Sequence, residues 1–531
     1  MNMTIEIAEL QQKNESLQVQ VNDLAATVAK LGTLVKYYEE QLLLAKRREF
    51  GVSSERTLID NTTCPQLSLF DDNKAEDKNT LLELETEEIT YKRKKRKGKR
   101  EEDLSGLPVE RVDHELSEDK RDCPECGESM DDIGADVRRE LKLIPAQVVV
   151  VEHATHAYAC HNPKCQETVG KTLITRAAAP MPLLGGSLAS PSLVAHIAVQ
   201  KYANGMPLYR IENGFLYDGV IISRQNMANW VIKCAEMYLT AIYSMLIKYL
   251  LRESILHSDE TTVQVLREPG RAPQTKSYEW VYRTSGCSQR KIVIYDYKET
   301  RKREHPARFL KDFKGFLHTD GYDVYHGLPS DITVVGCFAH VRRYWEKVLK
   351  TIPKDKRKGT DAECGVAFIN RLFDLERAFK DLSPEERYER RLEKSKPVVD
   401  AFFVWVDKLK ALPKSPLGEA VHYSLSQRKY LENVFLDGRL EISNNRCERS
   451  VKPFVMGRKA WLFSNSPDGA AASSIMYSII ETAKENSLHP YHYVKFLLET
   501  LPRATTSGLE ALLPWSDSIP ECCRAPIKAP M

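Results

Sequence analysis

Three acidic residues stand where a metal-dependent reaction on a phosphodiester would need them. Asp259 lies within a short apolar stretch, Asp320 follows another, and Glu448 comes soon after Ser443 and two asparagines, at the start of an expected helix. Carboxylate oxygens suit Mg²⁺ and Mn²⁺, and two such ions about 3.5–4 Å apart activate a nucleophile and stabilise a leaving oxygen. Most acidic side chains of a soluble protein are simply solvated. The predicted metal site therefore rests on the joint placement of all three acids.

Glu481 is a second candidate for the third acid. It lies inside an apolar helix expected over residues 475–483, where a packed or surface glutamate is the more ordinary explanation. Glu448 is preferred because Ser443 or one of the asparagines can cap a helix, which places Glu448 in the first turn.

A mixed sheet is predicted to bring Asp259 and Asp320 together. Three hairpin-linked strands, followed by strands that alternate with helices, form a sheet covered by helices, in the order of the ribonuclease H-like fold. In that fold the first and fourth strands are neighbours. We expect this catalytic domain over residues 251–485, with a mostly helical insertion over residues 351–439. The expected strands cover residues 255–265, 278–282, 292–297, 316–319 and 332–338, and the expected helices between them cover 305–313 and 339–349.

Other residues with chemistry to offer flank the expected acids. Cys337 and His340 lie one helical turn apart and are predicted to support the site, either by orienting it or by binding a metal. A packed cysteine and a hydrogen-bonded histidine are the plainer alternative. A basic cluster that would contact DNA phosphates, with a tryptophan that would stack on an unpaired base, follows the third acid. A basic surface patch beside a core tryptophan explains the same residues equally well: Arg449, Lys452, Arg458, Lys459 and Trp461.

Two pairs of cysteines predict a structural zinc site within residues 116–175. Each pair spans a short loop, so that four thiolates can converge on one tetrahedral ion. The surrounding unit has too little apolar mass to fold alone, which makes the metal a folding requirement. His156 and His161 are alternative ligands, and four free thiols are the alternative without metal. The predicted ligands are Cys123, Cys126, Cys160 and Cys165.

The remaining segments suggest how the chain is organised around this chemistry. A heptad pattern over residues 1–50 predicts a two-stranded parallel coiled coil, with Asn14 fixing its register, and hence a homodimer. An amphipathic helix packed on its own chain is the alternative. Residues 51–115 are expected to be a flexible linker, and the basic run from Lys92 to Arg100 is either a solvated part of that linker or a segment that contacts phosphates. Residues 186–250 are expected to be helical, as a helix-turn-helix DNA-binding unit or a plain bundle, and residues 486–531 form a C-terminal region. The heptad positions are Ile7, Leu10, Asn14, Leu17, Val21, Leu24, Val28, Leu31 and Val35.

The composition is that of a soluble protein. Hydrophobic residues make up 42% and charged residues 28% of the 531 residues, and the net charge is only +3. The longest apolar stretch, Tyr238 to Leu251, contains Lys248 and is too short to span a bilayer, so no transmembrane segment is expected. Met1 to Leu10 carries glutamates and does not resemble a secretory signal. We therefore expect a cytoplasmic protein with no membrane partner.

Taken together, these motifs make the chain similar to the transposases of the bacterial insertion sequence 66 family. The resemblance implies a DDE transposase of the bacterial nucleoid, with Asp259, Asp320 and Glu448 as its acidic trio and Mg²⁺ or Mn²⁺ as its cofactor. It also implies companion proteins from the same mobile element. Ser443 and Ala460 depart from the usual pattern, where aspartate and asparagine are common, but neither is a presumed metal ligand. The motifs are the zipper, the paired cysteines, Asp259-Glu-Thr261, Asp320-Gly-Tyr322, Cys337-Phe-Ala-His340 with Arg342-Arg343, Asn444 to Arg449, Gly457 to Phe463 and Tyr477 to Lys484.

Two other functions are compatible with parts of the sequence. The zipper, the zinc unit and the helical region would suffice for a DNA-binding regulator without catalysis. A nuclease of the same fold would use the same metal site and cut DNA without joining it. The acids at the strand ends favour an enzyme that cleaves the terminal inverted repeats of an element and joins them to target DNA.

Overall fold

The computed structural model describes residues 147–161 and 174–525, together with a discontinuous set of positions between residues 13 and 38. The predicted zinc ligands Cys123, Cys126 and Cys165 lie outside the described residues. So do the expected linker over residues 51–115 and the heptad positions Ile7 and Leu10.

A five-stranded mixed sheet forms the centre of the described part. Its strand order is β5-β4-β3-β6-β7, with β5, β4 and β3 antiparallel and β6 and β7 parallel to β3. All five strands expected from the sequence are present. The strands are β3 (Ile255–Gln264), β4 (Lys276–Thr284), β5 (Val293–Lys298), β6 (Gly315–His318) and β7 (Ile332–Val335).

The fifth strand is shorter than the sequence suggested. The prediction ran to Phe338, but β7 ends at Val335, and Phe338 is already the first residue of a helix. The backbone N–H of Gly336 donates to Tyr430 O at 2.9 Å, and that of Phe338 donates to Ile442 O at 3.0 Å. These backbone N–H groups bond to segments outside the sheet, so they cannot extend the hydrogen-bond ladder of β7.

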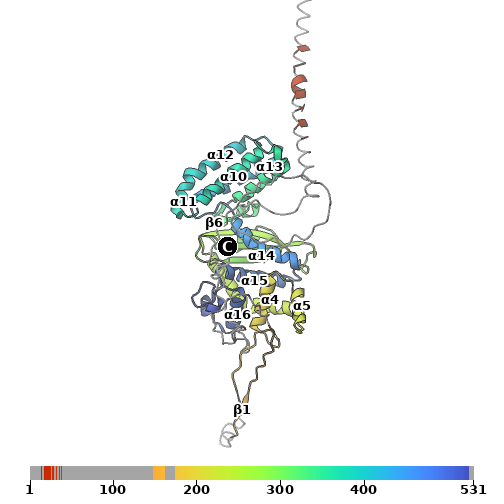
Figure 1. Cartoon of the computed structure of the whole chain (residues 1–531), viewed down its shortest axis with the longest axis vertical. Helices are drawn as coiled ribbons and strands as arrows, with labels where there is room; N and C mark the ends of the chain where they lie inside the picture. Colours follow the sequence, from red (N-terminus) through yellow and green to blue (C-terminus); the bar gives the residue numbers. More distant parts are fainter. Residues whose placement is uncertain are drawn as a thin grey trace, which may run out of the picture. The chain divides into compact units, whose positions relative to one another are not determined.

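Both faces of the sheet are covered, so its strands have no solvent side. Trp280, Val281 and Tyr282 are consecutive residues of β4, point to alternate faces, and are all fully buried. On one face α15 (Pro467–Glu485) and α7 (Thr240–Leu250) pack against β5, and α4 (Pro191–Tyr202) and α16 (Pro490–Thr500) pack against α15. Figure 1 shows α4, α15 and α16 on the side of the sheet away from α10 (Asp361–Ala378) and α13 (Pro416–Leu431).

The edge strand β5 is protected by side chains of α15. Val293 N–H donates to Thr482 Oγ1 at 3.0 Å, and Tyr295 N–H donates to Ser478 Oγ at 2.8 Å. The hydroxyls satisfy backbone donors that would otherwise be free to pair with another strand.

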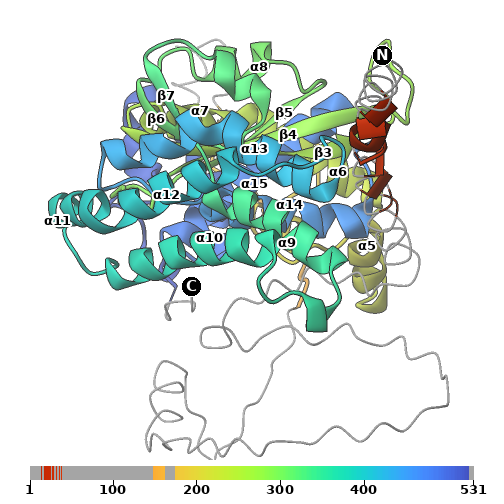
Figure 2. The same cartoon turned by 90° about the horizontal axis from the view of Figure 1, so that it is seen from above.

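The opposite face carries a second core, built mainly from residues 338–436. Trp345 of α9 lies at its centre, and its Nε1 donates to Ser424 Oγ at 3.2 Å. Arg391 is buried and forms an ion pair with Glu376 at 2.6 Å. Figure 2 looks onto these helices with the strands behind them. They are α9 (Phe338–Thr351), α10 (Asp361–Ala378), α11 (Pro384–Arg390), α12 (Lys396–Asp407) and α13 (Pro416–Leu431).

The helical region before the sheet begins as the sequence predicts. Ser190 caps α4 by accepting from Leu193 N–H, and Pro191 occupies the first turn. α5 (Leu208–Tyr217) and α6 (Arg224–Cys234) follow, and Ser223 caps α6 by accepting from Asn226 N–H. A role of this pair in reading a DNA groove stays a prediction.

One helix of the described part, Arg224–Leu250, is long and apolar enough to cross a membrane by length and composition. It runs from α6 through a π-helical turn at Ala235–Leu239 into α7. Core helices of soluble proteins meet the same criterion, and here Met227, Leu239 and Leu246 are fully buried in the core that α15 also enters.

The described residues also include two short strands and one short helix. β1 (Ala157–Ala159) and β2 (Ile174–Arg176) form a small antiparallel pair, and α8 (Glu304–Phe309) connects β5 to β6. At the amino terminus, the described heptad residues from Leu17 to Val35 are helical, and their apolar side chains are 53% to 65% exposed. The coiled-coil dimer stays a prediction.

Candidate active site

Strand register places Asp259 beside Asp320. His257 of β3 is directly opposite His318 of β6 in a parallel pair, and the two aspartates each follow two residues later. Neighbouring strands lie about 4.8 Å apart. The Asp320 Oδ1 atom accepts a hydrogen bond from Tyr322 N–H at 3.0 Å, which fixes the carboxylate as the chain leaves β6. The two acids therefore face the same end of the sheet.

Asp259 lies in a cluster of negative charge. Burial raises its pKa well above the ordinary value, and the neighbouring acids Glu260, Asp320 and Glu448 raise it further. Its Oδ1 accepts the Glu260 N–H at 2.8 Å, which only partly offsets these effects. Repulsion between close carboxylates of this kind is relieved by a bound cation.

Asn444 joins the start of α14 (Asn445–Trp461) to β3. The helix has Glu448 in its first turn, as predicted. An asparagine, Asn444, occupies the cap position as expected, but its side chain makes no capping hydrogen bond in the described structure. Instead its Nδ2 donates to Ser258 O at 2.8 Å, and its Oδ1 pairs with His257 Nδ1 at 2.9 Å. These bonds hold the helix against the strand immediately before Asp259.

Glu448 lies among Cys337, His340 and Arg343. Candidate ligand atoms of Cys337, His340 and Glu448 all lie within 4.8 Å of one another. Arg343 donates to Glu448 Oε2, and Cys337 Sγ accepts the backbone N–H of Asn444 at 3.1 Å. The structure thus places Cys337 and His340 beside Glu448, and their supporting role stays a prediction.

Arg343 also determines which ring nitrogen of His340 carries the proton when the ring is neutral. The Arg343 Nη1 atom lies 3.0 Å from His340 Nε2, and a guanidinium can only donate, so Nε2 is the acceptor. A neutral His340 then carries its proton on Nδ1, which lies 3.7 Å from Glu448 Oε1. Within the described residues, neither Nδ1 nor Oε1 has a hydrogen-bond partner. Glu448 Oε1 is therefore a buried acceptor available to a cation.

Glu260 is an acid that the sequence analysis did not single out. It pairs with Arg301 and accepts a hydrogen bond from Tyr325 Oη at 2.7 Å. Burial and the charge of Asp320 raise its pKa, while Arg301 lowers it. Arg301 in turn lies 3.6 Å above the ring of Tyr322. The position of Glu260 next to Asp259, within the Asp259-Glu-Thr261 motif, was the feature of the sequence that could have identified it.

Helix α13 of the insertion braces the turn that carries Asp320. Tyr423 and Asp320 O form a 2.5 Å hydrogen bond with the tyrosine donating, and Gln427 Nε2 donates to Gly321 O at 3.4 Å. Gly321 has a φ of 91°, and a Cβ there would lie 2.7 Å from Tyr423 Oη. No function was assigned to this insertion from the sequence. Its contacts hold the turn that carries Asp320 in place.

The predicted DNA contacts divide into two groups. Arg449, Lys452 and Lys459 are exposed on α14. Arg458 is held by β3, with its Nη1 atom 3.1 Å from Thr261 Oγ1, and Trp461 packs edge-on against Phe454 at 5.5 Å. The exposed residues of α14 are therefore accessible to DNA phosphates. Arg458 and Trp461 are instead held by contacts within the protein.

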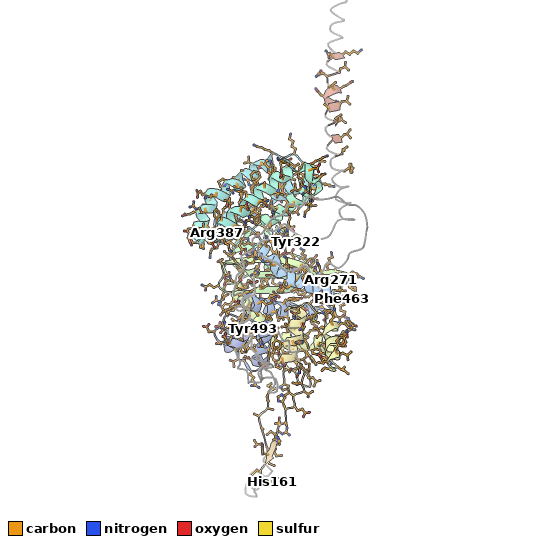
Figure 3. The ribbon with its side chains drawn as sticks, in the orientation of Figure 1. His161, Arg271, Tyr322, Arg387, Phe463 and Tyr493 are labelled. Carbon is orange, nitrogen blue, oxygen red and sulfur yellow. The ribbon has the colours of Figure 1, made fainter. Side chains whose placement is uncertain are left out.

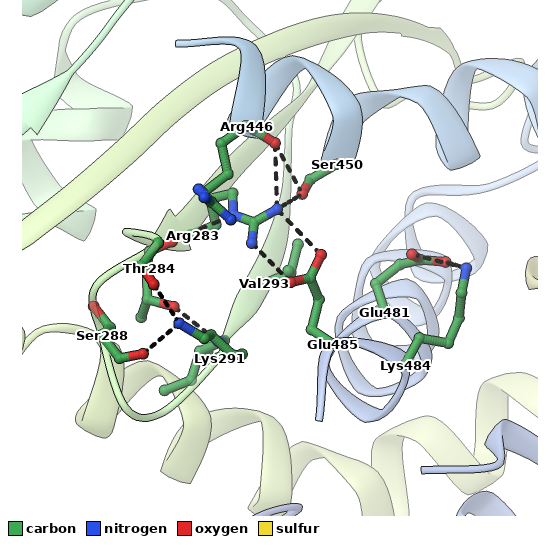
Figure 4. Close-up of polar contacts among 12 residues, drawn as sticks. Arg283, Thr284, Ser288, Lys291, Val293, Arg446, Ser450, Glu481, Lys484 and Glu485 are labelled. Atoms are coloured by element: carbon green, nitrogen blue, oxygen red, sulfur yellow. Dashed lines mark hydrogen bonds and ion pairs between the residues drawn. The ribbon is translucent and has the colours of Figure 1, made fainter. Parts of the chain in front are cut away.

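Glu481 lies apart from the cluster around Asp259. It is in α15, the helix that packs on β5, and forms an ion pair with Lys484 at 2.8 Å. Figure 4 shows this pair beside Glu485, which binds the buried Arg283 at 2.9 Å. Since β5 and β6 are separated by two strands, the position of Glu481 favours Glu448 as the acid near Asp259.

Comparison with known families identifies the chain. Residues 186–472, more than half of the 531, match a family model described as "Transposase IS66 family". The chain belongs to the IS66 family of transposases. Three further models match this transposase: "zinc-finger binding domain of transposase IS66" over residues 120–166, "IS66 C-terminal element" over 478–515, and "Transposase C of IS166 homeodomain" over 37–112.

Curated relatives of this IS66 transposase are uncharacterised. The chain is 32% identical over 404 residues to the uncharacterized protein y4qI of Sinorhizobium fredii (strain NBRC 101917 / NGR234), covering 72% of this chain and 71% of the relative. It is 28% identical over 413 residues to the uncharacterized protein y4hP of the same strain, covering 74% and 73%.

The zinc-finger match supports structural zinc in this transposase. The matched range contains all four predicted ligands, Cys123, Cys126, Cys160 and Cys165. The family as a whole supports binding to DNA and use of a divalent metal.

Proposed function

We propose that this IS66 transposase cleaves phosphodiester bonds at the ends of a bacterial insertion sequence and joins the freed ends to target DNA. The observation that supports this most directly is the register of β3 and β6, which sets Asp259 beside Asp320. We also propose that the sheet is ribonuclease H-like, because three antiparallel strands are followed by two strands parallel to the first.

We assign a pair of divalent cations, Mg²⁺ or Mn²⁺, to Asp259, Asp320 and Glu448. The donor set fits, because all three ligands are carboxylates, Asp259 lies in uncompensated negative charge, and Glu448 Oε1 is buried without a partner in the described region. When bound, such ions activate water or a 3′ hydroxyl and stabilise the leaving oxygen.

The protein's own groups position these carboxylates. Asn444 ties the helix that carries Glu448 to β3, and Tyr423 and Gln427 hold the turn after Asp320. Arg343 holds Glu448 by donating to its Oε2 atom. We propose that Arg343, which is half exposed, serves as a counter-charge for Glu448 when no cation is bound.

DNA would approach along the exposed side of α14. Arg449, Lys452 and Lys459 lie on the helix that presents Glu448, so phosphates bound there would run toward the acids. Arg458 and Trp461 would contribute by shaping that helix rather than by contacting DNA freely.

We further propose the arrangement of the whole molecule. The zipper over residues 1–50 would form a homodimer that holds two element ends at once. Residues 51–115 would be a linker, residues 116–175 a zinc domain, residues 186–250 a helical DNA-binding region, residues 251–485 the catalytic domain, and residues 486–531 a C-terminal region. Companion proteins of the same element would take part, and the reaction would occur in the cytoplasm on the bacterial nucleoid.

A cleavage and joining assay tests the proposal. Supercoiled plasmid carrying the element's ends is incubated with protein and Mg²⁺, and both cut and joined products are measured. Asp259→Asn and Asp320→Asn should abolish both products while leaving DNA binding unchanged. Asp312→Asn, at an exposed position in the same domain, is the matched control.

The results of this assay distinguish a transposase from a nuclease and from a DNA-binding regulator. Cleavage retained in either site variant rejects the assignment of the acids. Cleavage by the parent protein without joining identifies a nuclease of the same architecture. Binding without cleavage identifies a DNA-binding regulator.

A further inference from the structure

A cavity of about 610 Å³ opens directly beside Asp320. The turn of Asp320 to Asp323 forms one wall, α9 a second and α13 of the insertion a third. The volume is in the range of small-molecule sites and is far too small for a DNA duplex. Its occupant must therefore be a small unit that reaches the acids.

Three tyrosines, Tyr322, Tyr344 and Tyr423, contribute to the walls of this cavity. Tyr344 of α9 stacks on Tyr423 of α13, with ring centroids 4.3 Å apart and planes inclined by 19°. Tyr322 follows Asp320 and carries Arg301 on one face. Figure 3 shows Tyr322 where the insertion helices meet the sheet. All three rings line the cavity, and an aromatic ring is a sequence-tolerant surface for stacking a base, because every base has a π face.

Polar groups accompany the aromatic walls. His422 and Ser426 are exposed on α13, at the rim, and Lys347 pairs with Glu419 at 2.6 Å. Gln427 presents a buried amide at the Gly321 carbonyl. The lining thus combines stacking surfaces with hydrogen-bonding groups, as a site for a nucleobase requires.

We propose that this cavity is a subsite for a single unpaired nucleotide next to the phosphate that is cut. The inference rests on the proposed function, because the phosphate of that nucleotide would lie at Asp259 and Asp320 while its base enters between α9 and α13. A paired base cannot reach the cavity without leaving the duplex. The insertion would therefore bind DNA in addition to holding the turn that carries Asp320.

Binding of two matched DNA probes tests the proposal. The full-length protein, in Ca²⁺, is titrated with a flush 20-base-pair duplex and with the same duplex carrying one extra 2-aminopurine nucleotide at a 3′ end. Phosphate contacts are common to both probes and cancel in the comparison. Stacking of one base predicts a Kd roughly 5- to 100-fold lower for the overhanging probe. The fluorescence of its 2-aminopurine should also change on binding.

Two variants remove the subsite in opposite ways. Tyr344→Ala opens a wall, whereas Ser426→Trp fills the cavity from an exposed position that costs the fold little. Both should lose the preference for the overhang and still bind the flush duplex normally. Tyr388→Ala, at a partly exposed tyrosine of α11 outside the lining, is the control and should keep the preference.

The results separate this inference from the proposed function. A parent protein that binds both probes equally, or a Ser426→Trp variant that keeps the preference, overturns the subsite whatever the cleavage assay gives. Cleavage that survives in Asp259→Asn overturns the proposed function and leaves the measured preference standing as a separate fact.

Discussion

Replacing Asp259 with asparagine should stabilise the metal-free protein and remove its stabilisation by metal. Two unit charges on neighbouring strands, about 4.8 Å apart, repel by about 3.5 kcal/mol at an effective dielectric constant of about 20. Burial and the neighbouring acids raise the pKa of Asp259, so protonation of its carboxyl relieves this repulsion as pH falls. We therefore expect asparagine to raise the free energy of unfolding by about 1–3 kcal/mol. The side-chain oxygen of asparagine can still accept the Glu260 N–H bond.

The pH dependence has a definite sign. The folded pKa of Asp259 lies above its ordinary value, so the parent protein loses stability as pH rises from the ordinary value toward the folded one. Below the ordinary value both states are protonated, and the parent and Asp259→Asn should be equally stable. The advantage of asparagine should then grow with pH.

Thermal unfolding measures these effects. Protein with stoichiometric zinc is desalted free of other metals, and Tm is recorded with and without Mn²⁺. Mn²⁺ at 100 times its Kd should stabilise the parent by about 2.7 kcal/mol and leave Asp259→Asn nearly unchanged, so the order of the two Tm values reverses. Asp312→Asn should behave as the parent. A lower Tm for Asp259→Asn without metal, or an equal response to Mn²⁺, would refute the charge cluster as the reason for metal binding.

Three further predictions concern the groups around the acids and the zinc unit. Gly321→Ala should cost about 1–3 kcal/mol, since it forces a side chain into positive φ and a contact 2.7 Å from Tyr423 Oη; a Tm and a cleavage rate equal to those of the parent would count against the brace. Asn444→Ala should cost about 2–5 kcal/mol, because it leaves two buried partners at His257 and Ser258 unsatisfied, and should weaken Mn²⁺ binding in a calorimetric titration. Cys160→Ser should lower the zinc content measured by elemental analysis, with Cys364→Ser, an exposed cysteine, as the control that keeps it.

The positions of the strands along the chain were predictable because each strand follows a local sequence pattern. Each strand of the sheet is a short run rich in branched and aromatic residues between turn-forming segments, and the caps of α4 and α6 are single serines with local partners. The end of β7 was misjudged by three residues, because Gly336 and Phe338 bond to segments about a hundred residues away. No local pattern carries that information.

By itself, the sequence determined which residues have the chemistry: the acids Asp259, Asp320 and Glu448, the paired cysteines, and the motifs that resemble the IS66 family. Only the tertiary structure decided how the acids are supported. Strand register sets Asp259 opposite Asp320, Asn444 turns from capping α14 to binding β3, and Tyr423 brings the insertion onto the Asp320 turn. The physical reason is distance along the chain. A cap or a strand depends on residues within a few positions, whereas the hydrogen bonds that Asn444, Tyr423 and Arg343 make around these acids join groups more than a hundred residues apart.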